Sequence, residues 1–157
     1  MKLKEFIKKN GRVYMDHIRN GKVIGTRDIT NTITNAGLAA VADLILLDNP
    51  GSTLGFDHIA IGTGTTGATS GDTTLEAEIS TGGGSRVAGT GTRVTTAETN
   101  DTAQLEVTYT FSSSFAVTET GMFNAASSGV MLARTTFSAV NVVSSDQLTI
   151  RWKIQNS

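Results

Sequence analysis

The sequence contains no cysteine, one proline and few aromatic residues, which make up 6% of its 157 positions. Without cysteine, a disulfide framework, a thiolate nucleophile and a cysteine-ligated metal site are excluded. No apolar run approaches the roughly 20 residues that a membrane-spanning helix needs, so we expect no membrane partner. The charged fraction of 17% lies below the roughly 25% of an average soluble domain.

Threonine, serine and glycine are abundant instead. Threonine is β-branched and fits the half-buried, pleated surface of a sheet, while the 17 glycines favour tight turns. A chain of this length forms one domain and buries about 70% of the surface that its unfolded form exposes. We therefore expect a core built by packing alone, in a fold of many short strands.

Apolar and polar residues alternate strictly in two segments near the C-terminal end. Their apolar positions are Leu105, Val107, Tyr109 and Phe111, and then Leu148, Ile150, Trp152 and Ile154. Two further strands are expected at 117–125 and 130–138, joined at Ser127-Ser128-Gly129. Short strands separated by turns predict a mainly β fold, an antiparallel β-sandwich or barrel.

Two local patterns complete the expected fold. Asn20-Gly21 lies between two β-rich runs and suits a type I′ hairpin turn. The segment at about 36–47 is the one expected helix, with Asn35 as its N-cap, and its apolar stripe through Leu38 is wide enough to predict burial on more than one side. We divide the chain into a basic N-terminal arm with a β-hairpin (1–30) and a sandwich or barrel body (31–157).

Charge is distributed unevenly between these two parts. Residues 1–30 hold eight basic and three acidic residues, a net +5, whereas the remainder holds five basic and eleven acidic residues, a net −6. This asymmetry predicts docking onto an acidic partner surface or a neighbouring copy; a solvated, frayed N-terminus is the alternative. The predicted contact residues are Lys2, Lys4, Lys8, Lys9, Arg12, Arg19 and Lys22. The arm has too few aromatics to stack bases, so no nucleic-acid partner is expected.

Few residues of the sequence could form a catalytic, nucleotide-binding or metal-binding site. The loop GTGTTG (62–67) has the glycine spacing of a dinucleotide-binding motif, but such a motif must open a helix, and further loop residues follow here. A phosphate-binding loop would need a lysine at position 68, where this sequence has Ala68. We predict a flexible loop there. Asp57 and His58 are adjacent in a strand, which predicts opposite faces rather than a shared metal site. No catalytic residue, cofactor or metal site is predicted, and we expect no enzymatic activity.

Several segments, taken together and in order, resemble small virion proteins of tailed bacteriophages. They read NTITNAGLAAVADLI, FDHIAIGTGTT, NDTAQLEVTYTF and FAVTETGMFNAASSGVMLARTTFSAVNV followed by DQLTIRWKI. The similarity spans about residues 31–154. The part TETGMFN…GVMLARTTF is also similar to a strand pair near the start of some phage tail-fibre proteins. These motifs are structural, and the resemblance implies no catalytic residues.

The resemblance and the charge asymmetry together predict a non-enzymatic structural protein of the virion, assembled in the host cytoplasm. We expect a capsid decoration (cement) protein on the particle exterior, a trimer or other homo-oligomer whose basic arm docks on the major capsid protein. The alternative is a tail, collar or baseplate/fibre-associated protein whose hairpin pairs with a neighbouring subunit. A carbohydrate-binding adhesion module is more remote, because Trp152, Tyr109 and Phe111 are expected in the core rather than on a sugar platform.

Overall fold

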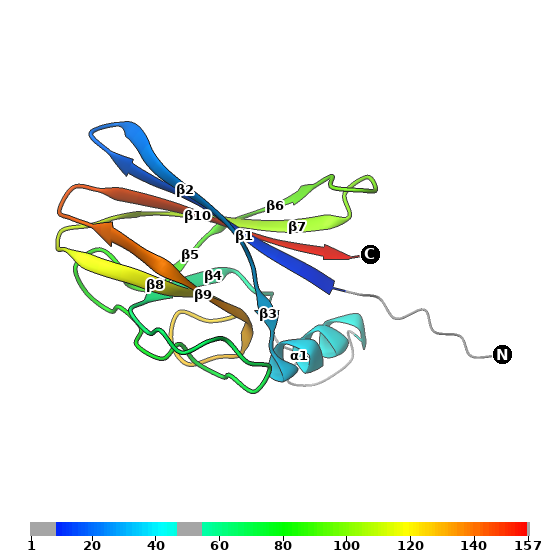
Figure 1. Ribbon diagram of the computed structural model, residues 1–157. Coiled ribbons are helices and arrows are strands. Elements are labelled where there is room, and N and C mark those ends of the chain that lie inside the picture. The colour runs from blue at the N-terminus through cyan, green and yellow to red at the C-terminus, as the bar shows by residue number, and fades with distance from the viewer. Residues whose placement is uncertain (1–8, 47–54, 157) are drawn as a thin grey trace.

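Two five-stranded antiparallel sheets pack face to face in the computed structural model, which describes residues 9–46 and 55–156 (Figure 1). Sheet A has the strand order β2-β1-β10-β7-β6, and sheet B has the order β3-β9-β8-β4-β5. The elements are β1 (Lys9–Arg19), β2 (Lys22–Thr30), β3 (Thr32–Ile33), α1 (Asn35–Leu46), β4 (His58–Gly62), β5 (Val87–Ala88), β6 (Thr90–Val94), β7 (Thr102–Thr110), β8 (Phe115–Phe123), β9 (Met131–Val142) and β10 (Gln147–Asn156). The predicted mainly β fold is confirmed, and it is a sandwich.

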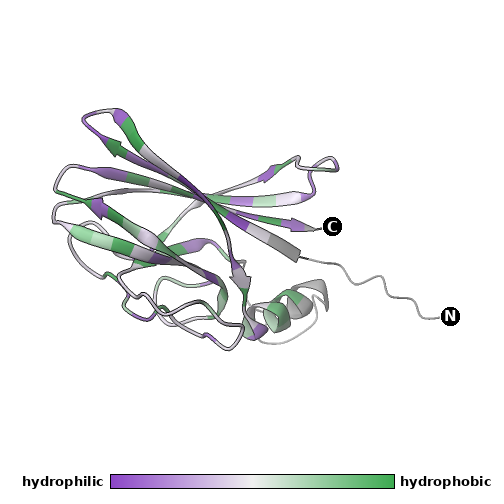
Figure 2. Ribbon diagram, viewed as in Figure 1, coloured by the Kyte–Doolittle hydropathy of each residue, from purple (hydrophilic) through white to green (hydrophobic). Residues whose placement is uncertain are grey.

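The main core lies between the sheets and is built by the strands whose alternation the sequence shows (Figure 2). All eight predicted apolar positions of β7, β10 and the residue after β7 are buried. β7 and β10 are neighbours, with Leu105 opposite Trp152. The Tyr109 hydroxyl donates to the Ile59 carbonyl of β4 (2.7 Å), so one core side chain also ties sheet A to sheet B.

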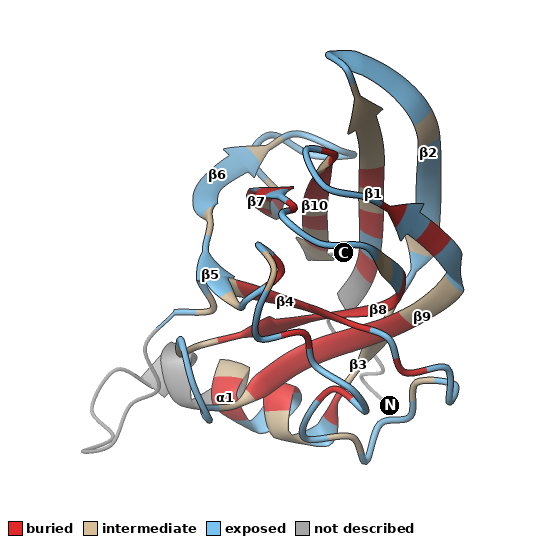
Figure 3. Ribbon diagram, turned by 90° about the vertical axis from the view of Figure 1, so that its left-hand side faces the viewer, coloured by how far each residue is buried: buried red, intermediate tan, exposed pale blue. Residues whose placement is uncertain are grey.

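Sheet B has a second covered face. Its β8 is buried continuously from Val117 to Phe123, on both faces, because the long segment between β4 and β5 crosses its outer side (Figure 3). A small apolar cluster fills that side, consisting of Ala60, Leu75, Phe123 and Met131. The Arg86 guanidinium stacks on the Phe123 ring, 3.6 Å from its centroid, and closes this cluster.

The predicted hairpin exists, and its turn residues Asn20 and Gly21 both have positive φ angles, 50° and 72°. Its separation from the body, however, is wrong for the described residues. β1 pairs with β10 from Lys9 to Ile18, and Val13 and Met15 are buried in the main core. The described part of segment 1–30 is therefore two strands of sheet A rather than an arm, because its inward side chains complete the core.

Helix α1 begins at Asn35. Its N-cap is Thr34, whereas the sequence predicts Asn35. The Thr34 Oγ1 accepts the Gly37 N–H (2.9 Å). Gly37 lies so close to the Leu132 backbone of β9 that any side chain there would overlap it. This close approach turns Leu38 outward, where it is 48% exposed, so in its described first turns the helix is buried on one face only.

Candidate interaction surface

Strand β2 is the longest of the four edge strands in the described residues. It has nine residues, whereas β6 has five and β3 and β5 have two each. Seven of the nine are exposed, and the strand is pale blue over most of its length in Figure 3. Two large apolar side chains near the turn, Val23 and Ile24, are 57% and 51% exposed. An exposed edge of this length is a template for pairing with another chain.

The pairing with β1 shows which backbone groups of β2 face outward. The Asn31 N–H donates to the Gly11 carbonyl (3.2 Å), so this pair is a hydrogen-bonded one. Because such pairs alternate along an antiparallel ladder, Thr26 and Asp28 direct their N–H and C=O groups away from β1. The outer edge of β2 therefore presents backbone N–H donors at these two positions and the Asp28 carbonyl, while the Thr26 carbonyl accepts a hydrogen bond from Arg27 Nη1 (3.0 Å).

A β-bulge at Ile24 divides this edge into two parts. The partners of His17 and Ile18 are Gly25 and Val23, which leaves Ile24 as the extra residue. Ile24 lines a cavity of about 150 Å³ between the hairpin and β9. Beyond the bulge, toward Thr30, the edge is regular. The hairpin thus offers a regular strand edge next to an apolar tip.

The structure does not gather the predicted contact residues into one patch. Lys2, Lys4 and Lys8 lie outside the described residues, and Lys9 is the first residue of β1. Arg12 forms an ion pair with Asp28 of β2 (2.8 Å). The other two are Arg19, at the far end of β1, and Lys22, which is exposed at the start of β2. Arg12 and Arg19 are seven residues apart on one strand, so they face opposite sides of the sheet.

Arg19 fastens the hairpin to the β9–β10 turn. Its Nε and Nη2 atoms donate to the two carboxylate oxygens of Asp146 (2.8 and 2.7 Å), and His17 Nε2 lies 2.7 Å from Asp146 Oδ2. Asp146 is buried, and the Arg19 hydrogen bonds hold the pKa of its carboxyl well below the usual range. The sequence analysis missed this contact because Asp146 lies more than 120 residues from its partners and in no motif.

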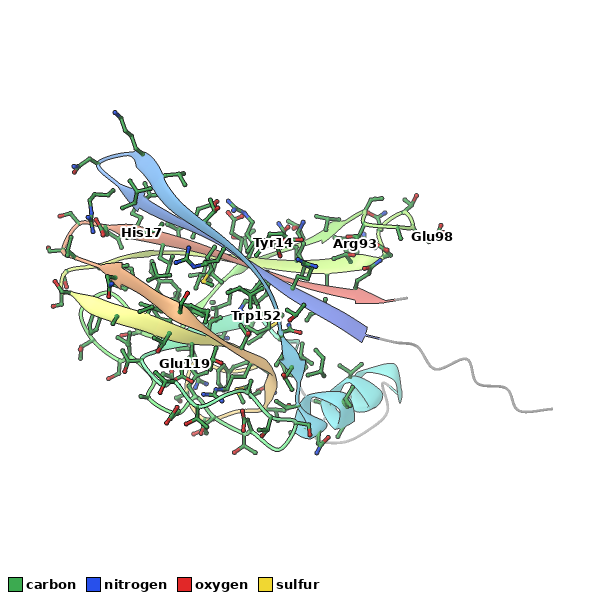
Figure 4. The ribbon with its side chains drawn as sticks, in the orientation of Figure 1. Tyr14, His17, Arg93, Glu98, Glu119 and Trp152 are labelled. Atoms are coloured by element: carbon green, nitrogen blue, oxygen red, sulfur yellow. The ribbon has the colours of Figure 1, made fainter. Side chains whose placement is uncertain are left out.

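The outer face of sheet A is polar, and one of its cations, Arg151, forms ion pairs with two carboxylates. Arg151 on β10 lies between two carboxylates, with Nη1 2.7 Å from Asp16 of β1 and Nε 2.5 Å from Glu106 of β7. Figure 4 shows Tyr14 on this outer side and Trp152 between the sheets. The face therefore joins neighbouring strands through cross-strand ion pairs.

A buried ionic cluster lies on the opposite side of the molecule, on the covered face of sheet B. Glu119 of β8 pairs with Arg134 of β9 (2.8 Å), and Arg134 also contacts Asp72 (2.8 Å). The Glu119 carboxylate accepts the backbone N–H groups of Gly64 (3.0 Å) and Ala77 (2.7 Å). The glycine-threonine loop that the sequence predicts to be flexible is thus held by Glu119. This arrangement fixes the loop and brings no phosphate-binding helix end to it.

The prediction that Asp57 and His58 point apart is wrong. His58 Nδ1 lies 2.5 Å from Asp57 Oδ1, because Asp57 precedes the first residue of β4 and is not yet in the alternation of that strand. The described residues contain no group of three or more His, Asp or Glu side chains placed to hold a metal ion. Asp57 and His58 form an isolated pair near the surface.

Comparisons with known proteins returned no match: no family model, no curated protein and no solved structure resembles this chain closely enough to be reported. Within residues 9–46 and 55–156, no helix is both long and apolar enough to cross a membrane. The resemblance to phage virion proteins therefore stays a prediction from the sequence motifs.

Proposed function

We propose that this chain is a non-enzymatic structural component of a tailed-bacteriophage virion, and specifically a capsid decoration protein that assembles as a trimer or other homo-oligomer. The observation that carries the proposal is the free edge of β2, with outward backbone groups at Thr26 and Asp28 beside the exposed Val23 and Ile24. The structural motifs noted in the sequence support the same class of protein.

Attachment then proceeds by strand addition at β2. An extended segment of the major capsid protein or of a neighbouring copy pairs with the outward groups of the strand, while its side chains cover the apolar tip. Lys22 and Arg27 are both exposed on this strand, so an acidic segment fits it best. Of the predicted basic residues that the structure describes, Lys22 lies on this strand, whereas Arg12 and Arg19 each form an ion pair within the chain.

A tail, collar or baseplate location is the second candidate. The same β2 edge favours it, because strand addition between subunits serves a ring or a fibre base as well as it serves a shell. In both locations the chain attaches through the β2 edge, and the number of copies of the chain per particle distinguishes them.

Quantitative mass spectrometry of purified particles tests the proposal. We expect this chain in a ratio to the major shell protein of about one, or a simple fraction of one. A handful to a few dozen copies per particle would support the tail, collar or baseplate location instead. Absence of the chain from particles would overturn the proposal of a virion protein.

A further inference from the structure

The outer face of sheet A has a hollow of about 290 Å³ whose lining residues all carry polar groups. Its floor comes from β1 and β10, and its wall is the loop that joins β6 to β7. The lining residues are Arg12, Tyr14, Thr95, Thr96, Thr102, Lys153 and Gln155. This volume is near the lower limit of small-molecule sites, which suits a ligand group of one ring.

Two cations face each other at this hollow. Arg12 and Lys153 are directly opposite in the β1–β10 register, an arrangement of like charges that destabilises a sheet. Arg12 has Asp28 as its partner. The Lys153 ammonium lies over the Tyr14 ring, 4.9 Å from its centroid, and no described residue forms an ion pair with it. Two residues away on β10, Arg151 has two carboxylate partners, so Lys153 is the cation left for an external anion.

The wall of the hollow is fixed before any ligand arrives. The Asp101 carboxylate accepts the backbone N–H groups of Thr96 (2.9 Å), Ala97 (3.0 Å) and Glu98 (3.1 Å), which holds the loop in a tight turn. Asp101 also accepts the Gln155 side-chain amide (3.0 Å) and so ties the loop to β10. A preorganised wall lowers the conformational entropy that binding would otherwise cost.

We propose that this hollow binds an acidic sugar, with the carboxylate of a uronic acid placed between Lys153 and Arg12. The Tyr14 ring offers an aromatic contact. The Thr95 and Thr96 hydroxyls accept hydrogen bonds from the Asn100 N–H and the Thr102 hydroxyl, which leaves their own O–H groups to donate to sugar hydroxyls. The Gln155 amide nitrogen donates to Asp101, so its carbonyl oxygen is the group that can accept from the sugar. An acidic peptide supplies the charge but not the hydroxyls that this lining complements. The inference is independent of the proposed virion role, because it concerns the face of sheet A and not the β2 edge.

Calorimetric titration of the full chain with oligogalacturonate, at low salt, tests this site. The matched ligand is the same oligomer with its carboxylates methyl-esterified, which keeps the rings and removes the charge. We expect the acidic oligomer to bind about tenfold or more tightly than the ester, since hydrogen bonds to charged groups are the strong ones. Lys153→Gln should weaken binding by a similar factor.

Arg93→Gln is the control variant, because Arg93 is an exposed cation on β6 that does not line the hollow. It should change the affinity less than twofold. Equal binding of acid and ester, equal effects of the two variants, or no binding would each overturn the proposal. Tighter binding of a polyglutamate peptide than of oligogalacturonate would also overturn it and would identify the hollow as a protein-docking site.

Discussion

Glu119 and Arg134 lie where the loop between β4 and β5 covers sheet B, and their side chains are 0% and 3% exposed (Figure 4 labels Glu119). At the scale of residues, such a pair is costly to disrupt, since removing Glu119 leaves the buried Arg134 without its one fully buried carboxylate partner. The pair also connects two strands to the loop, so its loss affects the packing of the Phe123 cluster.

Glu119→Gln should therefore lower the free energy of unfolding by about 3–5 kcal/mol. The amide nitrogen of glutamine cannot accept the N–H groups that the carboxylate oxygens accept now. Urea denaturation followed by tryptophan fluorescence measures this, with Trp152 as the one tryptophan. Glu76→Gln is the control, because Glu76 is partly exposed and should have a much smaller effect. Equal losses for the two variants would contradict the assigned role of Glu119.

Asp146 makes stability depend on pH in a defined direction. Its folded pKa is lowered, first by the Arg19 hydrogen bonds, so its carboxylate stabilises the fold above the unfolded pKa of about 3.9. This contribution is lost as the pH falls below that value toward the folded pKa. Relative to Asp146→Asn, the wild type should be more stable at pH 7, and the difference should shrink between pH 4 and pH 2. A difference in urea midpoint that stays constant over this range would contradict the linkage.

At the scale of elements, the β1–β2 hairpin has two unequal halves. β1 pairs with β10 and buries one face in the core, whereas β2 is exposed and ends sheet A. The hairpin turn could be predicted from Asn20-Gly21, because both positions require positive φ. Its partner strand could not, because no local pattern indicates that the first described strand pairs with the last.

Met15→Ala and Val23→Ala distinguish a hairpin within the core from a separate arm. Met15 is buried, and its truncation should cost about 2–5 kcal/mol of unfolding free energy. Val23 is exposed, so its truncation should change stability by less than about 0.5 kcal/mol. Chemical denaturation of both variants checks this. Near-zero losses for both would show that the hairpin does not contribute to the core.

The helix shows a limit of periodicity. Its existence follows from the sequence pattern, but the pattern predicts a buried face that includes Leu38, whereas the structure buries Gly37 and Ala40. A glycine gives no apolar signal, and only the neighbouring β9 backbone makes it the contact residue. Sequence patterns locate elements here better than they locate the contacts between elements.

At the scale of the whole molecule, the uneven charge of the sequence is partly used inside the fold. Cations of the first 30 residues pair with distant carboxylates, as Arg19 does with Asp146. Arg12 pairs with Asp28 inside the same segment. For the described residues, the net charge of the segment therefore overstates the number of cations without an ion-pair partner. Lys22 and Arg27 are exposed cations of the described hairpin, and both lie on β2.

Reattachment of the chain to purified particles that lack it tests the role of this edge most directly. Thr26→Pro removes one outward N–H without touching the ladder to β1, and the preceding Gly25 tolerates the restriction that proline imposes. Thr26→Ala is the control that keeps the N–H, and urea denaturation should show both variants folded. We predict that Thr26→Ala reattaches like the wild type and that Thr26→Pro loses at least about tenfold in affinity, the effect of losing a strand-pairing contact. Reattachment of a folded Thr26→Pro variant with wild-type affinity would contradict the account.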